Sequence, residues 1–279
     1  MIKLYISTFN KPIDWIHERV DIKFVQPIEV GADCRDQFVY ELKDNTGDNI
    51  SWDNALWGEL TGLYWIWRNV KFSDDDIIGF AHYSKIIDIQ ERTIHRLFEA
   101  NQQPFWIVKR PFTMCQFSYK GKVGKELSII EDVLKKDYPE YYKTWQELYD
   151  DTGMNRVGIQ GANDCQMFYA SSAEFKNYCD FLFSVMFKVR EMCGDGDQEI
   201  PPYFRRYCAL LGDRLLSVYL KTRKINFKEF RAYTPDITLL RRIKDDIRYY
   251  SGVDKTRWYK QRNERKRYVR KDSMWAINM

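Results

Sequence analysis

Short apolar runs alternate with longer amphipathic segments over most of this chain, and that alternation limits the folds it can adopt. Residues 2–8 and 22–30 are predicted strands, the second ending at Gly31. Between residues 53 and 70 the apolar side chains instead recur at steps of three and four residues, which is typical of an amphipathic helix. Strands that alternate with helices predict an α/β domain with a largely parallel sheet.

The same pattern continues along the rest of the chain. Further strands are predicted at 76–83, 104–110 and 165–170, and further helices at about 125–150, 172–192 and 203–221. We expect residues 1–235 to form the α/β domain and residues 236–279 to form a basic helical C-terminal extension.

The stretch DDDIIGFAHYSK, residues 74–85, raises the question of which of its two ends carries chemistry. An acidic triplet precedes its apolar residues, and His82 and Tyr83 follow them. In open α/β sheets, ligands bind beyond the carboxyl ends of the strands, where loops and helix N-termini converge. His82 and Tyr83 lie at that end, so the acidic triplet is predicted to be a solvated turn. The Asp-x-Asp within GDGD, residues 194–197, is predicted to be a linker.

Charge is unevenly distributed along the chain. The net charge is +4, yet residues 241–272 hold 13 Lys or Arg against 5 Asp or Glu, a local +8, so the remaining residues carry −4. Trp258, Tyr259 and Tyr268 interleave with these basic residues. A solvated terminal helix is the simplest interpretation, contact with an anionic membrane surface comes second, and nucleic-acid binding is the least favoured.

Composition argues against several other classes of protein. A chain of 279 residues that is 44% hydrophobic and 16% aromatic can bury a substantial core, so disorder is not expected. Six cysteines without a Cys-x-x-Cys pair and three histidines argue against a structural zinc site or a disulfide framework. The start lacks a signal-peptide pattern, and no apolar run reaches the roughly 18 residues of a membrane span. We therefore expect a cytoplasmic protein.

A polar stretch, DNTGDNIS at residues 44–51, leads into the predicted helix at 53–70. The free N–H groups and the dipole at a helix N-terminus can receive an anion or sugar hydroxyls. From the spacing alone, an Asx-rich loop with a capping Ser51 or Asp53 is the simpler interpretation.

Several stretches taken together carry a family resemblance. They are IEVGA (28–32), DNTGDNIS (44–51), ELTGLYWIWRN (59–69) and IIGFAHY (77–83), followed by CQMFYASSAEFKNYCDFLF (165–183) and LLGDRLLSVYL (210–220). In this order they resemble the successive motifs of a family of bacterial glycosyltransferases encoded in capsular, exopolysaccharide and O-antigen loci, long catalogued as a domain of unknown function. The resemblance covers residues 2–221.

What the resemblance implies is a GT-A-like fold and transfer of a sugar, galactofuranose or galactose, from a UDP-sugar donor. The implied acceptor is a saccharide, usually lipid-linked, in cell-surface polysaccharide biosynthesis. The residues implied in donor binding are Thr8, Val30, Gly31, Ala32, Asp48, Asn49, Ser51, Glu59, Thr61, Tyr83 and Lys85. Asp213, Arg214 and His82 match positions implied in catalysis, and Gln166 matches a position implied in acceptor binding.

The chain departs from the family pattern at three of these motifs. Ser84 and Lys85 stand where the family has two arginines, so one cation is lost and the other is less bidentate. Asp213 replaces a glutamate and Gln166 an asparagine. These departures bear on the donor and the acceptor more than on the fold.

The implied reaction sets requirements for the site. Cleavage of the C–O bond to a diphosphate needs groups that stabilise charge on the phosphate and position the acceptor hydroxyl. We expect Asp213 to act as the base, Arg214 or Lys85 to offset leaving-group charge, and His82 to lie near the diphosphate. Since the strand end lacks Asp-x-Asp, protein cations are expected to take the place of Mn²⁺ or Mg²⁺. The alternative is a metal ion held by His82 and a distant carboxylate.

Two other functions stay open at this point. One is a nucleic-acid-binding module built around residues 241–272. The other is a non-catalytic protein that binds nucleotide sugar or scaffolds a polysaccharide assembly, because a fold alone does not give an activity.

Overall fold

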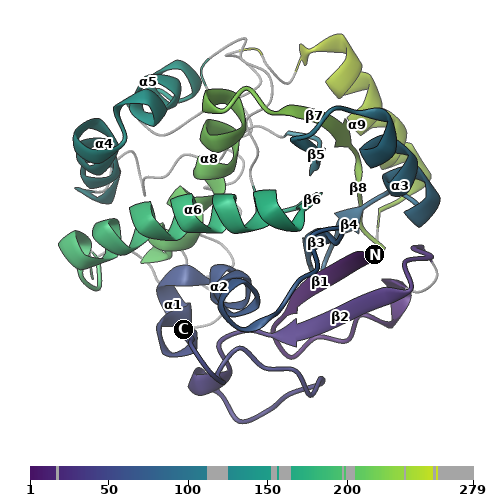
Figure 1. Ribbon diagram of the computed structural model, residues 1–279, viewed down its shortest axis with the longest axis horizontal. Helices are drawn as coiled ribbons and strands as arrows, with labels where there is room; N and C mark the ends of the chain where they lie inside the picture. The colour runs from purple at the N-terminus through teal and green to yellow at the C-terminus, as the bar shows by residue number, and fades with distance from the viewer. Residues whose placement is uncertain are drawn as a thin grey trace.

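The computed structural model describes residues 1–16, 19–111, 125–151, 156, 165–196, 198, 205–235, 237–253 and 256 (Figure 1). Its strands are β1 (Ile2–Thr8), β2 (Phe24–Glu29), β3 (Ile77–His82), β4 (Ile86–Ile87), β5 (Phe105–Lys109), β6 (Phe168–Ser171), β7 (Asn226–Phe230) and β8 (Ala232–Tyr233). Its α-helices are α1 (Asn54–Trp57), α2 (Leu60–Asn69), α3 (Glu91–Ala100), α4 (Lys125–Asp137), α5 (Pro139–Leu148), α6 (Ser172–Cys193), α8 (Tyr207–Thr222) and α9 (Leu239–Ser251).

A six-stranded sheet with the order β2-β1-β3-β6-β5-β7 forms the centre of the molecule. β1 pairs in parallel with β2 and β3, and β5 pairs in parallel with β7. β6 runs antiparallel to both of its neighbours. The predicted α/β fold with a largely parallel sheet is therefore confirmed, and β7, which the apolar pattern did not reveal, adds a strand at one edge.

Alternating side chains along the strands divide the core into two layers. In β5, Trp106 and Val108 point into one layer, and Phe105 and Ile107 point into the other. Helices α2, α4, α5, α6 and α8 cover the first layer, and α3 covers the second (Figure 1). The sheet is thus buried on both faces, which is why its strands are nearly continuous apolar runs in the sequence.

The single helix predicted at 53–70 is wrong, because the chain breaks at Gly58. This glycine has φ 54° and ψ −131°, a conformation that ends α1 before α2 starts at Leu60. Asn54 holds the break together: its side-chain amide donates to the carbonyl oxygen of Gly58 at 2.7 Å and to Oγ1 of Thr61 at 2.9 Å. The helix predicted at 125–150 is also two helices, because Pro139 begins α5.

The acidic triplet before β3 is a solvated turn only in part. Asp74 and Asp75 are exposed, as expected, but Asp76 is buried and forms an ion pair with Lys3 at 2.6 Å. The parallel pairing of β1 with β3 causes this, since it aligns Ile2 with Ile77 and so brings the start of both strands together. The prediction was therefore wrong for Asp76.

The C-terminal part of the described chain packs against the far edge of the sheet. After β7 and β8, α9 lies close to α3 and β7 in Figure 1. Residues 257–279 of the basic extension lie outside the described residues, as does Asp197 of the GDGD stretch. The predicted boundary at residue 235 stays a prediction.

Candidate functional site

The carboxyl ends of β1, β2 and β3 meet at one edge of the sheet. Parallel pairing puts Ser7 beside His82, and the N–H of Val30 donates to the carbonyl oxygen of Thr8 at 2.9 Å. The N–H of Tyr83 donates to the carbonyl oxygen of Ser7 at 2.8 Å. The strand-polarity argument therefore placed His82 correctly, at the edge where α/β folds bind their ligands.

A tight turn after β3 brings Lys85 beside His82. The two residues exchange backbone hydrogen bonds, with the N–H of His82 donating at 3.3 Å and the N–H of Lys85 donating at 3.1 Å. Directly opposed residues of an antiparallel pair place their side chains on the same face. The His82 ring lies 6.3 Å from that of Phe80, so this is the face covered by α2 and α8.

Glu59 is the centre on which the basic side chains of this face converge. Its Oε1 lies 3.9 Å from Nε2 of His82, and its Oε2 lies 3.2 Å from Nη2 of Arg206. Burial raises the pKa of Glu59, yet its three basic neighbours, Lys85 among them, together hold that pKa below its ordinary value. We call these four residues, Glu59, His82, Lys85 and Arg206, the Glu59 cluster.

The break at Gly58 allows α8 to approach Glu59. A Cβ on Gly58 would lie 2.5 Å from Nη2 of Arg206 and 3.5 Å from Cβ of Ala209. No side chain larger than hydrogen fits there without displacing Arg206, which is the N-cap residue of α8. The cluster therefore depends on a contact between residues far apart in sequence.

Asp213 lies on the side of α8 that faces Gly58. It follows Ala209 by four residues and Arg206 by seven, and residues at these spacings share one face of a helix. Its side chain is half-buried. This placement is compatible with the predicted role as a base beside the Glu59 cluster, which stays a prediction.

Arg214 points elsewhere. Its side chain is only 1% exposed, its guanidinium lies 6.0 Å from the ring centre of Tyr149, and burial lowers its pKa. The Tyr149 hydroxyl donates to the carbonyl oxygen of Arg214 at 3.0 Å. Arg214 is thus buried, and its predicted role in offsetting leaving-group charge stays a prediction.

The turn after β2 is organised by Asp44, which the sequence analysis missed. The N–H groups of Gly31 and Ala32 donate to the two Asp44 carboxylate oxygens at 2.9 and 3.0 Å. Oγ of Ser51 donates to the same carboxylate at 2.5 Å. Gly31, Ala32 and Ser51, three of the residues predicted to bind the donor, are therefore brought together. Their N–H and hydroxyl groups, however, already donate to the Asp44 carboxylate.

Asp48 and Asn49 are not brought to the Glu59 cluster. Asp48 accepts from the Tyr64 hydroxyl at 2.8 Å and from Nε of Arg68 at 2.6 Å. Arg68 is nine residues beyond Glu59, which corresponds to about 13 Å along the helix axis. Desolvation raises the pKa of Asp48, but the hydrogen bonds from Tyr64 and Arg68 together hold that pKa below its ordinary value. The Asn49 side chain closes the loop by bonding the backbone of Gly47 and Ser51.

Three more predicted residues use their side chains within the protein. Oγ1 of Thr8 donates to the carbonyl oxygen of Lys11 at 2.7 Å, and Oγ1 of Thr61 donates to that of Gly58 at 3.1 Å. Gln166 is fully buried: its amide nitrogen donates to the carbonyl oxygen of Gly212 at 2.8 Å, and its oxygen accepts from the Tyr178 hydroxyl at 2.7 Å. The role of Gln166 in acceptor binding stays a prediction.

The site does not present a ready set of metal ligands. Within the residues that the structure describes, no three His, Cys, Asp or Glu side chains gather closely enough to hold an ion. At the Glu59 cluster, both carboxylate oxygens of Glu59 already face basic groups. The expectation that protein cations serve in place of Mn²⁺ or Mg²⁺ stays a prediction, and the chemistry proposed below uses it.

The comparison with known families is decisive for classification. A profile described as a domain of unknown function, DUF4422, matches residues 11–224. The chain belongs to the DUF4422 family. No curated protein matches it.

The fold of this chain is similar to that of one solved structure. The structure of WbbM, described as a bifunctional glycosyltransferase in its apo form, superposes with a TM-score of 0.62 at 19% sequence identity. The match covers 85% of this chain and 45% of that chain, so this chain spans less than half of WbbM. At this identity the likeness shows a shared fold, and the predicted mostly parallel sheet flanked by helices is confirmed.

Two residues of this DUF4422 site were absent from the predictions, and each had a signal in the sequence. Arg206 precedes Asp213 by seven residues, the spacing of one helix face, so a search for cations upstream of Asp213 would have found it. Asp44 is the first residue of the DNTGDNIS stretch itself. Its partners, Gly31 and Ala32, end a different strand, so no local pattern links them.

Proposed function

We propose that this protein is a glycosyltransferase that moves a hexosyl unit, galactofuranose or galactose, from a UDP-sugar to a saccharide acceptor, lipid-linked, in cell-surface polysaccharide biosynthesis. The observation that carries the proposal is the convergence of His82, Lys85 and Arg206 on Glu59 at the carboxyl ends of β1 and β3. Basic side chains gathered at that edge suit a diphosphate, which carries most of the charge of a nucleotide-sugar donor. The glycosyltransferase-type fold supports the same proposal.

In the proposed reaction, an acceptor hydroxyl oxygen forms a bond with the anomeric carbon of the donor sugar. The bond from that carbon to the diphosphate oxygen breaks, and its electron pair leaves with UDP. Lys85 and Arg206 offset the charge that develops on the leaving group, and Asp213 takes the hydroxyl proton.

Glu59 holds the cations and does not act as the base. A general base works best when its pKa is close to the pH of the reaction, and the pKa of Glu59 is held below its ordinary value by its basic neighbours. Its carboxylate instead fixes His82 and Arg206 before the donor arrives. Such preorganisation lowers the free energy needed to rearrange the site during the reaction.

Donor binding is tested by thermal unfolding with a panel of UDP-sugars. A donor present at 100 times its dissociation constant should stabilise the full-length protein by about 2.7 kcal/mol. The Arg206→Gln variant should lose most of this gain. The matched control is Arg205→Gln, because Arg205 bonds Gln198 and not Glu59. If no UDP-sugar shifts the unfolding temperature of the wild type, the proposal is wrong.

Catalysis is tested separately from binding with Asp213→Asn. This variant should retain the thermal shift but release UDP about 10² to 10⁴ times more slowly in the presence of an oligosaccharide acceptor. Near-normal UDP release would remove Asp213 as the base. A wild-type protein that binds the donor and transfers nothing to any acceptor would instead match the non-catalytic, nucleotide-sugar-binding alternative.

A further inference from the structure

Helix α9 turns its apolar side chains toward solvent. The exposed residues, each between 47% and 76% accessible, are Leu239, Leu240, Ile243, Ile247 and Tyr250. They recur at steps of three and four residues, so they form one continuous stripe along the helix, which we call the outer face of α9. None of the residues of α9 is buried. This is the reverse of an ordinary surface helix, which turns its apolar stripe toward the core.

Polar contacts along the flank of the outer face that carries Asp246 fix α9 to the protein, and Arg110 also donates to the Tyr250 hydroxyl at 3.4 Å. Asp246 accepts from Arg110 at 2.7 Å and from Arg231 at 2.9 Å. The guanidinium of Arg110 also lies 4.0 Å from the ring centre of Tyr249, and the Tyr249 hydroxyl bonds Glu229 of β7. These contacts determine how the helix is rotated, so the outer face cannot turn inward without breaking them.

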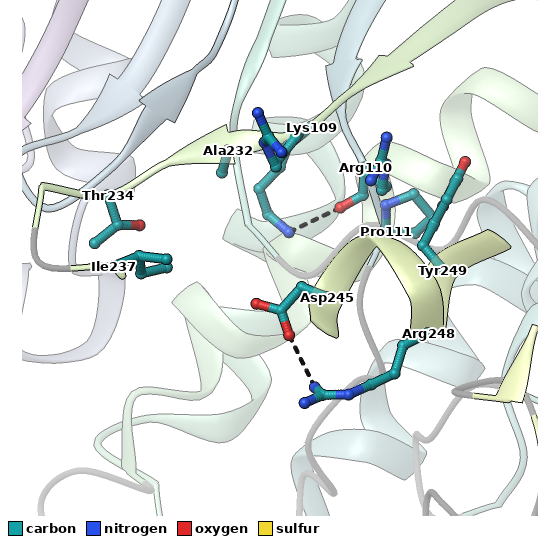
Figure 2. A pocket seen from close by; sticks show the side chains of 10 residues that line it. Lys109, Arg110, Pro111, Ala232, Thr234, Ile237, Asp245, Arg248 and Tyr249 are labelled. Carbon is teal, nitrogen blue, oxygen red and sulfur yellow. Dashed lines mark hydrogen bonds and ion pairs between the residues drawn. The ribbon is translucent and has the colours of Figure 1, made fainter. Parts of the chain in front are cut away.

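Figure 2 shows the side of α9 that faces the protein. Arg110 and Tyr249 lie side by side at a pocket of about 160 Å³ between the end of β5 and α9. Asp245 and Arg248 form an ion pair at 2.9 Å on the pocket side of the helix. Polar and charged groups of α9 thus face the protein, and the apolar groups are left on the far side.

A basic stripe runs beside the outer face. Arg241 and Lys244 are three residues apart, and Lys244 is spaced four residues from Leu240 and three from Ile247. The residues that follow α9 are also rich in Lys and Arg, giving residues 241–272 a local charge of +8. An apolar stripe bordered by basic residues is typical of helices that lie in the interface of an anionic membrane.

We propose that α9 docks this protein on an anionic membrane surface, with its outer face inserted at the level of the lipid headgroups. Charge complementarity selects this occupant: Arg241 and Lys244 would lie against anionic headgroups, each attracted by about 1 kcal/mol. A second copy of the chain would place two segments of charge +8 against each other, which is repulsive. A nucleic acid would attract the charges but leave the apolar stripe uncovered.

The helix is suited to lie along the membrane and not to cross it. Residues 239–251 form a helix about 20 Å long, shorter than the roughly 30 Å hydrocarbon core of a bilayer. Across the described part of the chain, no helix has the length and apolar character of a membrane span. Docking through α9 would therefore be peripheral and sensitive to salt.

Flotation of the full-length protein with lipid vesicles tests this proposal. Wild type should bind vesicles that contain phosphatidylglycerol, bind pure phosphatidylcholine vesicles weakly, and lose affinity as salt is raised. The double variant Leu240→Ser/Ile247→Ser should bind the anionic vesicles at least about tenfold more weakly than wild type, because two inserted apolar side chains are removed.

A matched control removes two exposed apolar side chains elsewhere. Met192 and Val39 are 57% and 46% exposed and lie on other parts of the surface, so Met192→Ser/Val39→Ser should bind vesicles like wild type. Both double variants should keep the wild-type unfolding temperature, since the side chains they alter are exposed.

Three results would overturn the proposal. The first is equal vesicle binding by wild type and Leu240→Ser/Ile247→Ser. The second is no preference for anionic over zwitterionic vesicles, or no binding to either. The third is a dimer in light scattering that this double variant converts to a monomer, which would assign the outer face to a second copy of the chain.

Discussion

Replacing Gly31 with alanine tests how the turn after β2 is coupled to the Glu59 cluster. Gly31 has φ 66° and ψ 35°, a left-handed conformation that costs a residue with a Cβ about 1 kcal/mol. The added Cβ would also lie 2.6 Å from Cγ of Asn54, which no packed structure tolerates. Asn54 must therefore move.

Moving Asn54 breaks the two hydrogen bonds that hold the α1–α2 break. Its amide donates to Gly58 at 2.7 Å and to Thr61 at 2.9 Å, and two such bonds contribute about 2 kcal/mol together. The expected loss for Gly31→Ala is thus about 3 kcal/mol, which lowers the unfolding temperature of a chain of this size by roughly 6–12 °C. Glu59, next to Gly58, should shift as well, so UDP-sugar binding should weaken.

Urea and thermal unfolding of matched variants separate the two contributions. Gly252 at the end of α9 has the same left-handed conformation, with φ 68° and ψ 10°, so Gly252→Ala reports the backbone contribution of about 1 kcal/mol. In an Asn54→Gly background the clash is absent, because Cγ at 2.6 Å and Cβ at 2.8 Å are both removed, so Gly31→Ala should then lose only that amount. If Gly31→Ala is no worse than Gly252→Ala, or if Asn54→Gly brings no relief, the packing argument is refuted.

Three further predictions concern other parts of the chain. Burial raises the pKa of Glu29, but N–H donors and Arg35 at 2.5 Å together hold that pKa below its ordinary value of 4.5. The ionised Glu29 therefore stabilises the fold above pH 4.5, and this stabilisation is lost as the pH falls through the lowered pKa. The difference in unfolding free energy between wild type and Glu29→Gln should narrow on acidification, and a difference that is constant with pH would contradict this. Gln166→Leu leaves the buried Tyr178 hydroxyl and the Gly212 carbonyl oxygen without their hydrogen bonds to Gln166, so it should destabilise the protein by about 3 kcal/mol in urea titration. A raised acceptor KM with unchanged stability would instead support a role of Gln166 in acceptor binding. Sugar transfer should persist in EDTA if protein cations serve the diphosphate, and activity that disappears and returns with Mn²⁺ would show the reverse.

Local patterns in the sequence were sufficient to place His82 at the carboxyl edge of the sheet. For β1, β2 and β3 the alternation of strands and helices predicts parallel strands, so the residues after Ile77 to Ala81 lie at a carboxyl end. His82 was identified by this reasoning, and Lys85 follows it in a turn that the backbone closes. The resemblance added Glu59, which the spacing alone did not mark as functional.

The partners of Glu59 could not be found in the same way. The apolar pattern of 53–70 continues across Gly58 without interruption, and the space beside Gly58 is filled by Arg206, which is 147 residues from its partner Glu59. Asp48, although it matches the family pattern, is held by Arg68 near the other end of α2. Which side chains of a polar loop face a site depends on packing that no local spacing encodes.

The sequence by itself determined the alternation of strands and helices, the parallel direction of β1, β2 and β3 and the amphipathic character of α9, because hydrophobic periodicity is a property of neighbouring residues. Only the tertiary structure decided which way α9 faces. Its apolar stripe would ordinarily predict burial, but Arg110 and Arg231, which directly follow β5 and β7, hold Asp246 and turn that stripe outward. Periodicity shows that a helix has two faces, whereas the contacts that long-range packing allows determine which face meets the protein.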